Sequence, residues 1–144
     1  MKTAGGINVS RDLLWMLTKN NSCHLIKRPA LKPLTKDPMN PKGIHSLRFA
    51  GSVQRKAMNV QAHPSGKGVQ LVFNKRRHQK RPAKRLAKIS LTKNSRKTLS
   101  TIRKFSNKFC YRTDLKNACL RRASAILRSQ QPKTPSKKTR GKKE

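Results

Sequence analysis

Residues 94–129, with the sequence NSRKTLSTIRKFSNKFCYRTDLKNACLRRASAILRS, contain the clearest helical pattern of the chain. Four apolar residues in the first half follow one another at steps of 3, 3 and 4, which places them on one face of a helix. They are Leu99, Ile102, Phe105 and Phe109. We predict a helix that begins at an Asn94 or Ser95 cap and ends near residue 109.

The second half of this stretch predicts another helix, with Thr113 as its N-cap and Asp114 in its first turn, ending near Ser129. Its apolar positions form a stripe that we expect to be buried. The stripe consists of Leu115, Ala118, Cys119, Ala123, Ile126 and Leu127. Three arginines, at 121, 122 and 128, fall outside it, so the helix would be apolar inside and cationic outside.

Three strand candidates precede these helices, at residues 46–50, 53–62 and 69–73. Glycine-containing turns at 51–52 and 64–68 separate them. Such short connections join antiparallel strands, so we predict a small antiparallel sheet. In the last strand, alternate residues 69, 71 and 73 share one face, whereas Val72 points to the other.

The N-terminal part predicts a helix at about 12–19, whose Leu13, Leu14 and Leu17 should pack onto the core. Base stacking by Trp15 is the minor alternative. A short strand is expected at 23–28. The segment 29–43 holds four prolines and Gly43, which predicts an irregular loop.

Basic residues occupy eight of the fourteen positions of segment 75–88, which also contains Pro82, so we expect a basic loop there. Residues 132–144 are a basic tail that has no apolar residue. The predicted fold class is therefore α+β: a small antiparallel sheet packed with about three helices, together with basic loops and an extended C-terminal tail. We expect one domain at 1–131, with a core that includes Leu71, Phe73, Ile102, Phe105, Ile126 and Leu127.

The charge balance bears most directly on function. The chain has 144 residues, with 37 Lys and Arg against 4 Asp and Glu, and a formal charge of +33. Self-repulsion of that size destabilises a compact monomer, which points to a polyanionic partner such as nucleic acid. Four acids can hardly supply paired catalytic carboxylates or a Mg²⁺ site, so we expect no enzyme, no cofactor and no small-molecule substrate.

The three cysteines, Cys23, Cys110 and Cys119, are odd in number and contain no C-x-x-C pair, which argues for a reducing compartment. Zinc held by these cysteines and one of the four histidines lacks the usual ligand spacing. A cysteine nucleophile has no local support either. No apolar stretch reaches the length of a membrane span, so we expect an intracellular protein without a membrane partner.

The cations are spread over loops, helix faces and the tail. Proteins that read the DNA major groove concentrate their contacts on one recognition helix, so this distribution suggests folded RNA as the partner. An RNP-type aromatic motif is missing, so we expect recognition through phosphates and sugars. The candidate RNA-binding residues are Arg28, Lys75, Arg76, Arg77, Lys80, Arg81, Lys84, Arg85, Arg103, Lys104, Arg121, Arg122 and Arg128.

Several blocks of this sequence resemble the eukaryote-specific large-subunit ribosomal proteins of the 28e family. The longest is Arg121-Arg122-Ala123-Ser124-Ala125-Ile126-Leu127-Arg128-Ser129-Gln130, preceded by Arg112-Thr113-Asp114-Leu115. Shorter blocks agree in the same order, at 14–16 with 25–28, at 46–51 with 55–56, and at 66–69. The similarity covers about residues 12–131.

The resemblance implies a structural, non-catalytic component of the 60S subunit that binds large-subunit rRNA beside neighbouring ribosomal proteins. It also implies a cytoplasmic location on the ribosome, with nucleolar passage during assembly. Three alternatives stay open. The first is a nucleolar assembly factor that carries a related domain, and the second is a chromatin-type basic protein that binds DNA. The third is an RNA-processing enzyme, whose turnover would depend on one of the four histidines, at 24, 45, 63 and 78.

Overall fold

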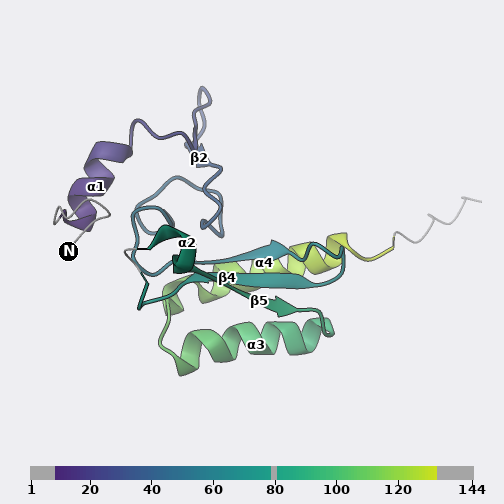
Figure 1. Cartoon of the computed structure of the whole chain (residues 1–144). Coiled ribbons are helices and arrows are strands. Elements are labelled where there is room, and N and C mark those ends of the chain that lie inside the picture. Colours follow the sequence, from purple (N-terminus) through teal and green to yellow (C-terminus); the bar gives the residue numbers. More distant parts are fainter. Residues whose placement is uncertain (1–8, 79–80, 133–144) are drawn as a thin grey trace, which may run out of the picture.

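The computed structural model describes residues 9–78 and 81–132. At its centre lies an antiparallel sheet of β3 (Met58–Ala62), β4 (Val69–Asn74) and β5 (Leu86–Leu91), in that order. The two long helices α3 (Ser95–Lys108) and α4 (Lys116–Ser129) follow β5 in the chain (Figure 1). The predicted α+β class is therefore confirmed.

The main core lies between one face of this sheet and the two long helices. Alternate residues of β3 and β4 point into it, among them Met58, Val60 and Leu71, all fully buried. From α3 it receives Ile102, and from α4 Cys119, also fully buried. The other predicted core residues, at 73, 105, 126 and 127, are partly buried and pack against this cluster, so the predicted core is confirmed.

The opposite face of the sheet is covered as well, by the segment that precedes β3. Val72 is buried in a second, small cluster with Met39 and Ala57. Beside it, the buried Asn59 donates from Nδ2 to the carbonyl oxygen of Pro38 at 2.7 Å. The sheet is thus the middle of a layered unit, in which a loop rather than a helix forms the third layer.

The β3–β4 hairpin depends on Gly68, whose φ of +84° lies in the left-handed region. A Cβ atom there would meet the Leu91 carbonyl oxygen at 2.6 Å, so only glycine fits this close approach. The Gln130 amide, just after α4, binds both the N–H and the C=O of Gly68, at 2.8 and 2.9 Å. This double hydrogen bond ties the end of α4 to the hairpin.

The strand predictions for the N-terminal half of the chain were partly wrong. Residues 46–50 form hydrogen-bonded turns onto the Ser46 carbonyl instead of a strand, and β3 begins only at Met58 rather than at 53. The strand expected at 23–28 is reduced to β1 (Leu25–Ile26). Its partner β2 (Leu34–Thr35) lies within 29–43, so this proline-rich segment is not wholly an irregular loop.

The prediction of a loop over 75–88 was also wrong. This segment contains the short helix α2 (Pro82–Arg85) and the first half of β5. Proline in the first turn does not oppose a helix, because that position needs no intrahelical N–H bond. Strand β5 lies at the edge of the sheet. Its Lys88 faces solvent, so the sequence lacks the clear alternation of apolar and polar residues that would predict a strand.

Helix α1 (Arg11–Thr18) forms where predicted, with the Ser10 hydroxyl accepting from the Leu13 N–H at 3.1 Å. The expectation that it packs onto the core was wrong, since none of its residues is buried. Leu13 and Leu17 are 51% and 67% exposed. The indole of Trp15 lies 4.8 Å from the imidazole of His45, measured between ring centroids, and this is the aromatic contact of the helix.

The two long helices match their predicted spans closely, but the predicted cap of α4 is wrong. A 3₁₀ turn, Thr113–Leu115, leads into α4, and the N-cap position of this turn is occupied by Arg112, in the left-handed conformation and with no side-chain capping hydrogen bond, rather than by Thr113. Phe109, which shares the predicted apolar face of α3 but not the predicted core, is 56% exposed at the end of the helix. The basic tail, residues 132–144, falls outside the described residues except for its first residue.

Candidate nucleic-acid interface

Most of the predicted RNA-binding side chains face solvent. Lys80 lies outside the described residues, and Arg85 and Arg122 are only half exposed. The remaining ten are exposed: Arg28, Lys75, Arg76, Arg77, Arg81, Lys84, Arg103, Lys104, Arg121 and Arg128. They come from the turn after β1, from the segment between β4 and β5, and from both long helices, so the fold distributes them over several surfaces.

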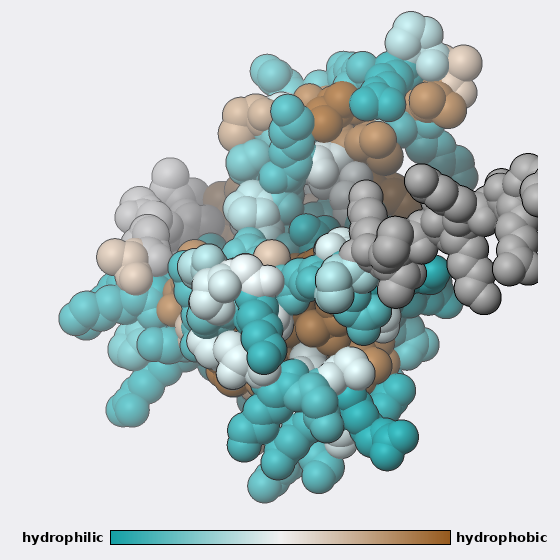
Figure 2. Space-filling model, turned by 90° about the vertical axis from the view of Figure 1, so that its right-hand side faces the viewer, coloured by the Kyte–Doolittle hydropathy of each residue, from teal (hydrophilic) through white to brown (hydrophobic). Residues whose placement is uncertain are grey.

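Helix α3 carries one group of polar side chains that lie close together. A shallow surface depression of about 350 Å³ along its first three turns is lined by polar and cationic side chains. They are Asn94, Arg96, Lys97, Ser100, Thr101 and Lys104. Figure 2 shows hydrophilic side chains gathered at the bottom of the molecule, at the level of α3, with apolar ones exposed higher up. Arg103, Lys104, Arg121 and Arg128 are called the outer cations below.

Three other arginines turn inward and bind the protein's own carbonyl oxygens. Arg122, on α4, donates from Nε to the Val60 carbonyl at 2.7 Å and from Nη1 to that of Pro41 at 3.4 Å. Arg85 donates to the carbonyls of Gly51 and Gln54 at 3.5 and 3.3 Å. With Arg112, described next, these are called the inner arginines.

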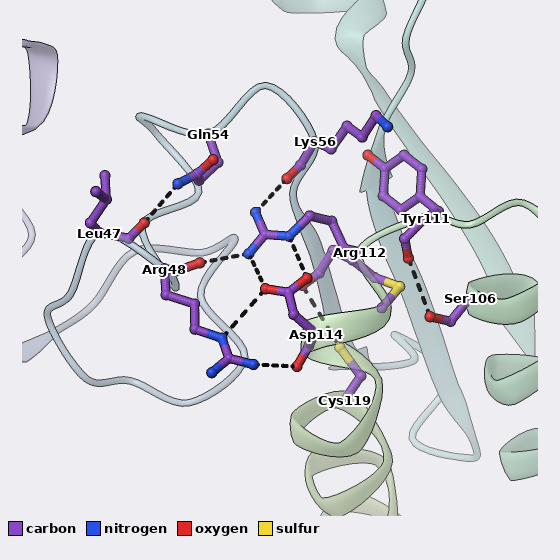
Figure 3. A network of polar contacts seen from close by, with 10 residues as sticks. Leu47, Arg48, Gln54, Lys56, Ser106, Tyr111, Arg112, Asp114 and Cys119 are labelled. Carbon is purple, nitrogen blue, oxygen red and sulfur yellow. Dashed lines mark hydrogen bonds and ion pairs between the residues drawn. The ribbon is translucent and has the colours of Figure 1, made fainter. Parts of the chain in front are cut away.

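Arg112 joins three parts of the chain (Figure 3). Its guanidinium binds both carboxylate oxygens of Asp114, at 2.9 and 2.8 Å, and the carbonyls of Lys56 and Arg48, at 2.9 and 2.6 Å. Arg48 returns to Asp114 with an ion pair of 3.5 Å. This network holds the loop before β3 against the start of α4.

Sequence reasoning missed the roles of Arg48 and Arg112. The one feature of the sequence that could have indicated these roles is Asp114. It is one of four acids in the chain and lies two residues after an arginine. Burial tends to raise the pKa of Asp114, but hydrogen bonds and charges from Arg112 and Arg48 outweigh it and lower this pKa below its usual value. The carboxylate therefore stays ionised and is used within the fold.

The other central acid, Asp37, is also used internally. Its Oδ1 accepts from the Met39 N–H at 2.9 Å, and its Oδ2 accepts from the N–H groups of Gly51 and Ser52 at 2.8 and 3.3 Å. Over residues 9–78 and 81–132, the arginines that approach a carboxylate within ion-pair distance are Arg11, Arg48 and Arg112. The outer cations thus have no carboxylate within reach in the described part of the chain.

The buried titratable groups of the core are held neutral. Desolvation raises the pKa of the Cys119 thiol to about 12, and also raises that of Tyr111, although the phenol donates to the carbonyl of Asn74 at 2.6 Å. Cys119 is a core residue, as predicted. Among the described residues, no three His, Cys, Asp or Glu side chains lie close enough to hold a metal ion.

In the ranges that the structure covers, no helix has both the length and the apolar character needed to cross a bilayer. The fold and surface together define the class: a small α+β scaffold that uses Asp37 and Asp114 internally and exposes most of its candidate cations, the surface expected of a polyanion-binding protein.

Comparison with known proteins gives the family. The model of the ribosomal L28e protein family matches residues 13–129. A protein of Schizosaccharomyces pombe named large ribosomal subunit protein eL28 is 37% identical over 131 residues, which cover 88% of this chain and 97% of the relative. The protein of the same name in Caenorhabditis elegans is 31% identical over 132 residues, covering 91% and 98%. The chain belongs to the ribosomal L28e family, as its sequence blocks predicted.

Proposed function

We propose that this protein is a structural constituent of the large ribosomal subunit that stabilises folded rRNA by neutralising phosphates. Both relatives named above are large-subunit proteins by name. The observation that carries the rRNA-binding part is the outward placement of ten candidate cations around a core that uses Asp37 and Asp114 internally. RNA phosphates are then the natural counter-charge for these side chains.

In this proposal the cations act at fixed positions. The outer cations stand on α3 and α4, two helices anchored on one core, so their spacing is set before RNA arrives. Preorganised charges lose less conformational freedom on binding than charges on a free chain. Lys75, Arg76 and Arg77 follow β4 directly, and the bond from Arg76 to the Phe109 carbonyl brings this segment to the end of α3. Segments of rRNA that repel each other could then approach across the protein.

The inner arginines contribute to the proposed function indirectly, by holding parts of the fold in place. Arg122 and Arg112 fix α4 to β3 and to the loop before it, through carbonyl oxygens rather than through phosphates. We therefore assign Arg122 and Arg85, two of the predicted RNA contacts, mainly to positioning. Catalysis has no part in this function. Neighbouring ribosomal proteins, passage through the nucleolus and residence on cytoplasmic ribosomes belong to the same proposal.

Sucrose-gradient sedimentation of a tagged full-length chain tests the proposed function. A structural constituent should cosediment with 60S subunits, monosomes and polysomes, and should remain there after a wash at moderate salt. Confinement to nucleolar precursor particles would instead indicate an assembly factor. Cosedimentation with chromatin and absence from polysomes would indicate a DNA-packing protein, and either result would overturn the proposal.

A further inference from the structure

Phe109 is the unusual aromatic residue of this protein. The chain has six aromatic side chains, all within the described residues, and Phe109 alone is exposed, at 56%. Phe73, Phe105 and Tyr111 form a packed cluster in which neighbouring ring centroids lie 4.7 to 5.8 Å apart. Phe109 rests on the outside of this cluster, 5.5 Å from the Phe105 ring. It is supported from behind and open to solvent.

The backbone after this ring is strained. Cys110 and Arg112 have φ values of +44° and +47°. These values lie in the left-handed region, which residues other than glycine and asparagine rarely adopt. Strain of this kind persists only where surrounding contacts enforce it, and it is common at functional sites.

The contacts that enforce this conformation are made by Tyr111, which lies between the two strained residues, and by Arg112 itself. The Tyr111 N–H and C=O both bind Ser106, at 3.0 and 3.3 Å, and its phenol reaches the sheet. Arg112 is held by four hydrogen bonds to Asp114, Lys56 and Arg48. Phe109 is therefore presented next to a turn that is held by these contacts.

Basic residues are concentrated in the two segments that meet at Phe109, residues 75–77 after β4 and the end of α3. Arg76 donates from Nη2 to the carbonyl oxygen of Phe109 at 3.2 Å, which brings the basic segment after β4 beside the end of α3. Its neighbours Lys75 and Arg77 are exposed, as is Lys108, the residue before the ring. A flat apolar surface bordered by positive charges fits a nucleotide, which has a planar base and an anionic phosphate.

We propose that Phe109 is a stacking platform for one unpaired base of single-stranded RNA, with Arg76 and Lys108 binding the flanking phosphates. The inference rests on the proposed function and makes it more specific, because stacking requires a base that is free of its duplex. Every base has a π-face, so the site selects an unpaired nucleotide without selecting its identity. An aliphatic protein partner would not need the cations around the ring.

The test compares single-stranded with duplex RNA, using the full-length protein. The probes are an oligouridylate carrying one 2-aminopurine and an RNA duplex of equal length, measured at the same salt. The Phe109→Leu variant removes the ring and keeps an apolar side chain. The Phe109→Trp variant keeps a ring, and Leu31→Ala is the matched control, because Leu31 is 64% exposed outside this site.

We expect Phe109→Leu to weaken binding of the single strand about 5- to 150-fold, with duplex binding changed less than about twofold. Phe109→Trp and Leu31→Ala should bind both probes like the unaltered protein. Equal losses on both probes, or no loss on either, would overturn the inference. If Phe109→Leu does not fold, unchanged 2-aminopurine fluorescence on binding of the unaltered protein would overturn it.

The same data separate this inference from the proposed function. If the unaltered protein binds duplex and folded RNA in a salt-dependent manner while Phe109→Leu has no selective effect, the stacking site is wrong and the proposed function stands. If the unaltered protein binds neither RNA, both are wrong.

Discussion

The inner arginines and the outer cations are the same residue types in two regions of one small protein, and they do different things. Arg112 has a side chain only 13% exposed and binds two backbone carbonyls and a carboxylate. Arg103 and Arg121 stand on exposed helix faces. The lesson is that charge alone does not define an RNA contact: a guanidinium whose donors are already taken by carbonyls stabilises the fold first. Removing charge from the two regions should therefore have separable effects.

The largest effect on stability is expected for Arg112→Ala. This change leaves the carbonyls of Arg48 and Lys56 without their donor and leaves the Asp114 carboxylate with only the longer ion pair to Arg48, so the free energy of unfolding should fall by about 2–4 kcal/mol. Urea denaturation of the isolated protein measures it. Arg121→Ala is the control and should change stability by less than about 0.5 kcal/mol. Comparable losses in the two variants would abolish the distinction between the regions.

Arg122→Met should have the next largest effect. Methionine keeps much of the aliphatic stem but leaves the Val60 carbonyl without its donor at 2.7 Å, which should cost about 1–3 kcal/mol. The adjacent Arg121→Met makes the same chemical change on the exposed face and provides a matched control. Equal midpoints for the two methionine variants in a thermal melt would contradict the inward role of Arg122.

A smaller effect should appear as pH dependence through Asp114. Its pKa in the folded state is lowered, so its contribution is complete above the unfolded-state pKa near 3.8 and is lost as pH falls through the folded-state pKa. Because the carboxylate side chain is 36% exposed, solvent screening should keep the contribution below about 1 kcal/mol. The difference in unfolding free energy between the unaltered protein and Asp114→Asn should shrink below about pH 4. A difference that stays constant down to about pH 3 would argue against this ion pair.

The sequence predicts the parts of this fold that carry local patterns. Helices α3 and α4 each have an apolar stripe of their own, and β4 alternates between buried faces, so all three lie close to their predicted bounds. Strand β5 was missed because an edge strand exposes polar side chains such as Lys88. Helix α1 has the pattern of a packed helix, and no local signal distinguishes an apolar face on the core from one left exposed.

For the candidate site, exposure of most cations follows from composition, since charged side chains stay in water unless something binds them. The local sequence around each arginine does not show which of them turn inward. Arg122 binds the carbonyl of Pro41, 81 residues earlier, and Arg112 binds that of Arg48, 64 residues earlier. Those oxygens come into reach only after the sheet and helices have packed. Phe109 shares the apolar face of α3 in the sequence pattern, and the pattern alone does not show that its ring stays exposed where the helix ends.

The salt dependence of binding to folded large-subunit rRNA tests the central claim most directly. The unaltered protein should lose about 10³–10⁵-fold in affinity between 50 and 200 mM salt if about six to ten phosphates are met. Changing all four outer cations to glutamine should reduce the slope of log affinity against log salt by about 3, with little change in stability, whereas Arg122→Met should lower stability and leave the slope nearly unaltered. A shallow slope in the unaltered protein, or the same slope after the outer cations are removed, would contradict the account.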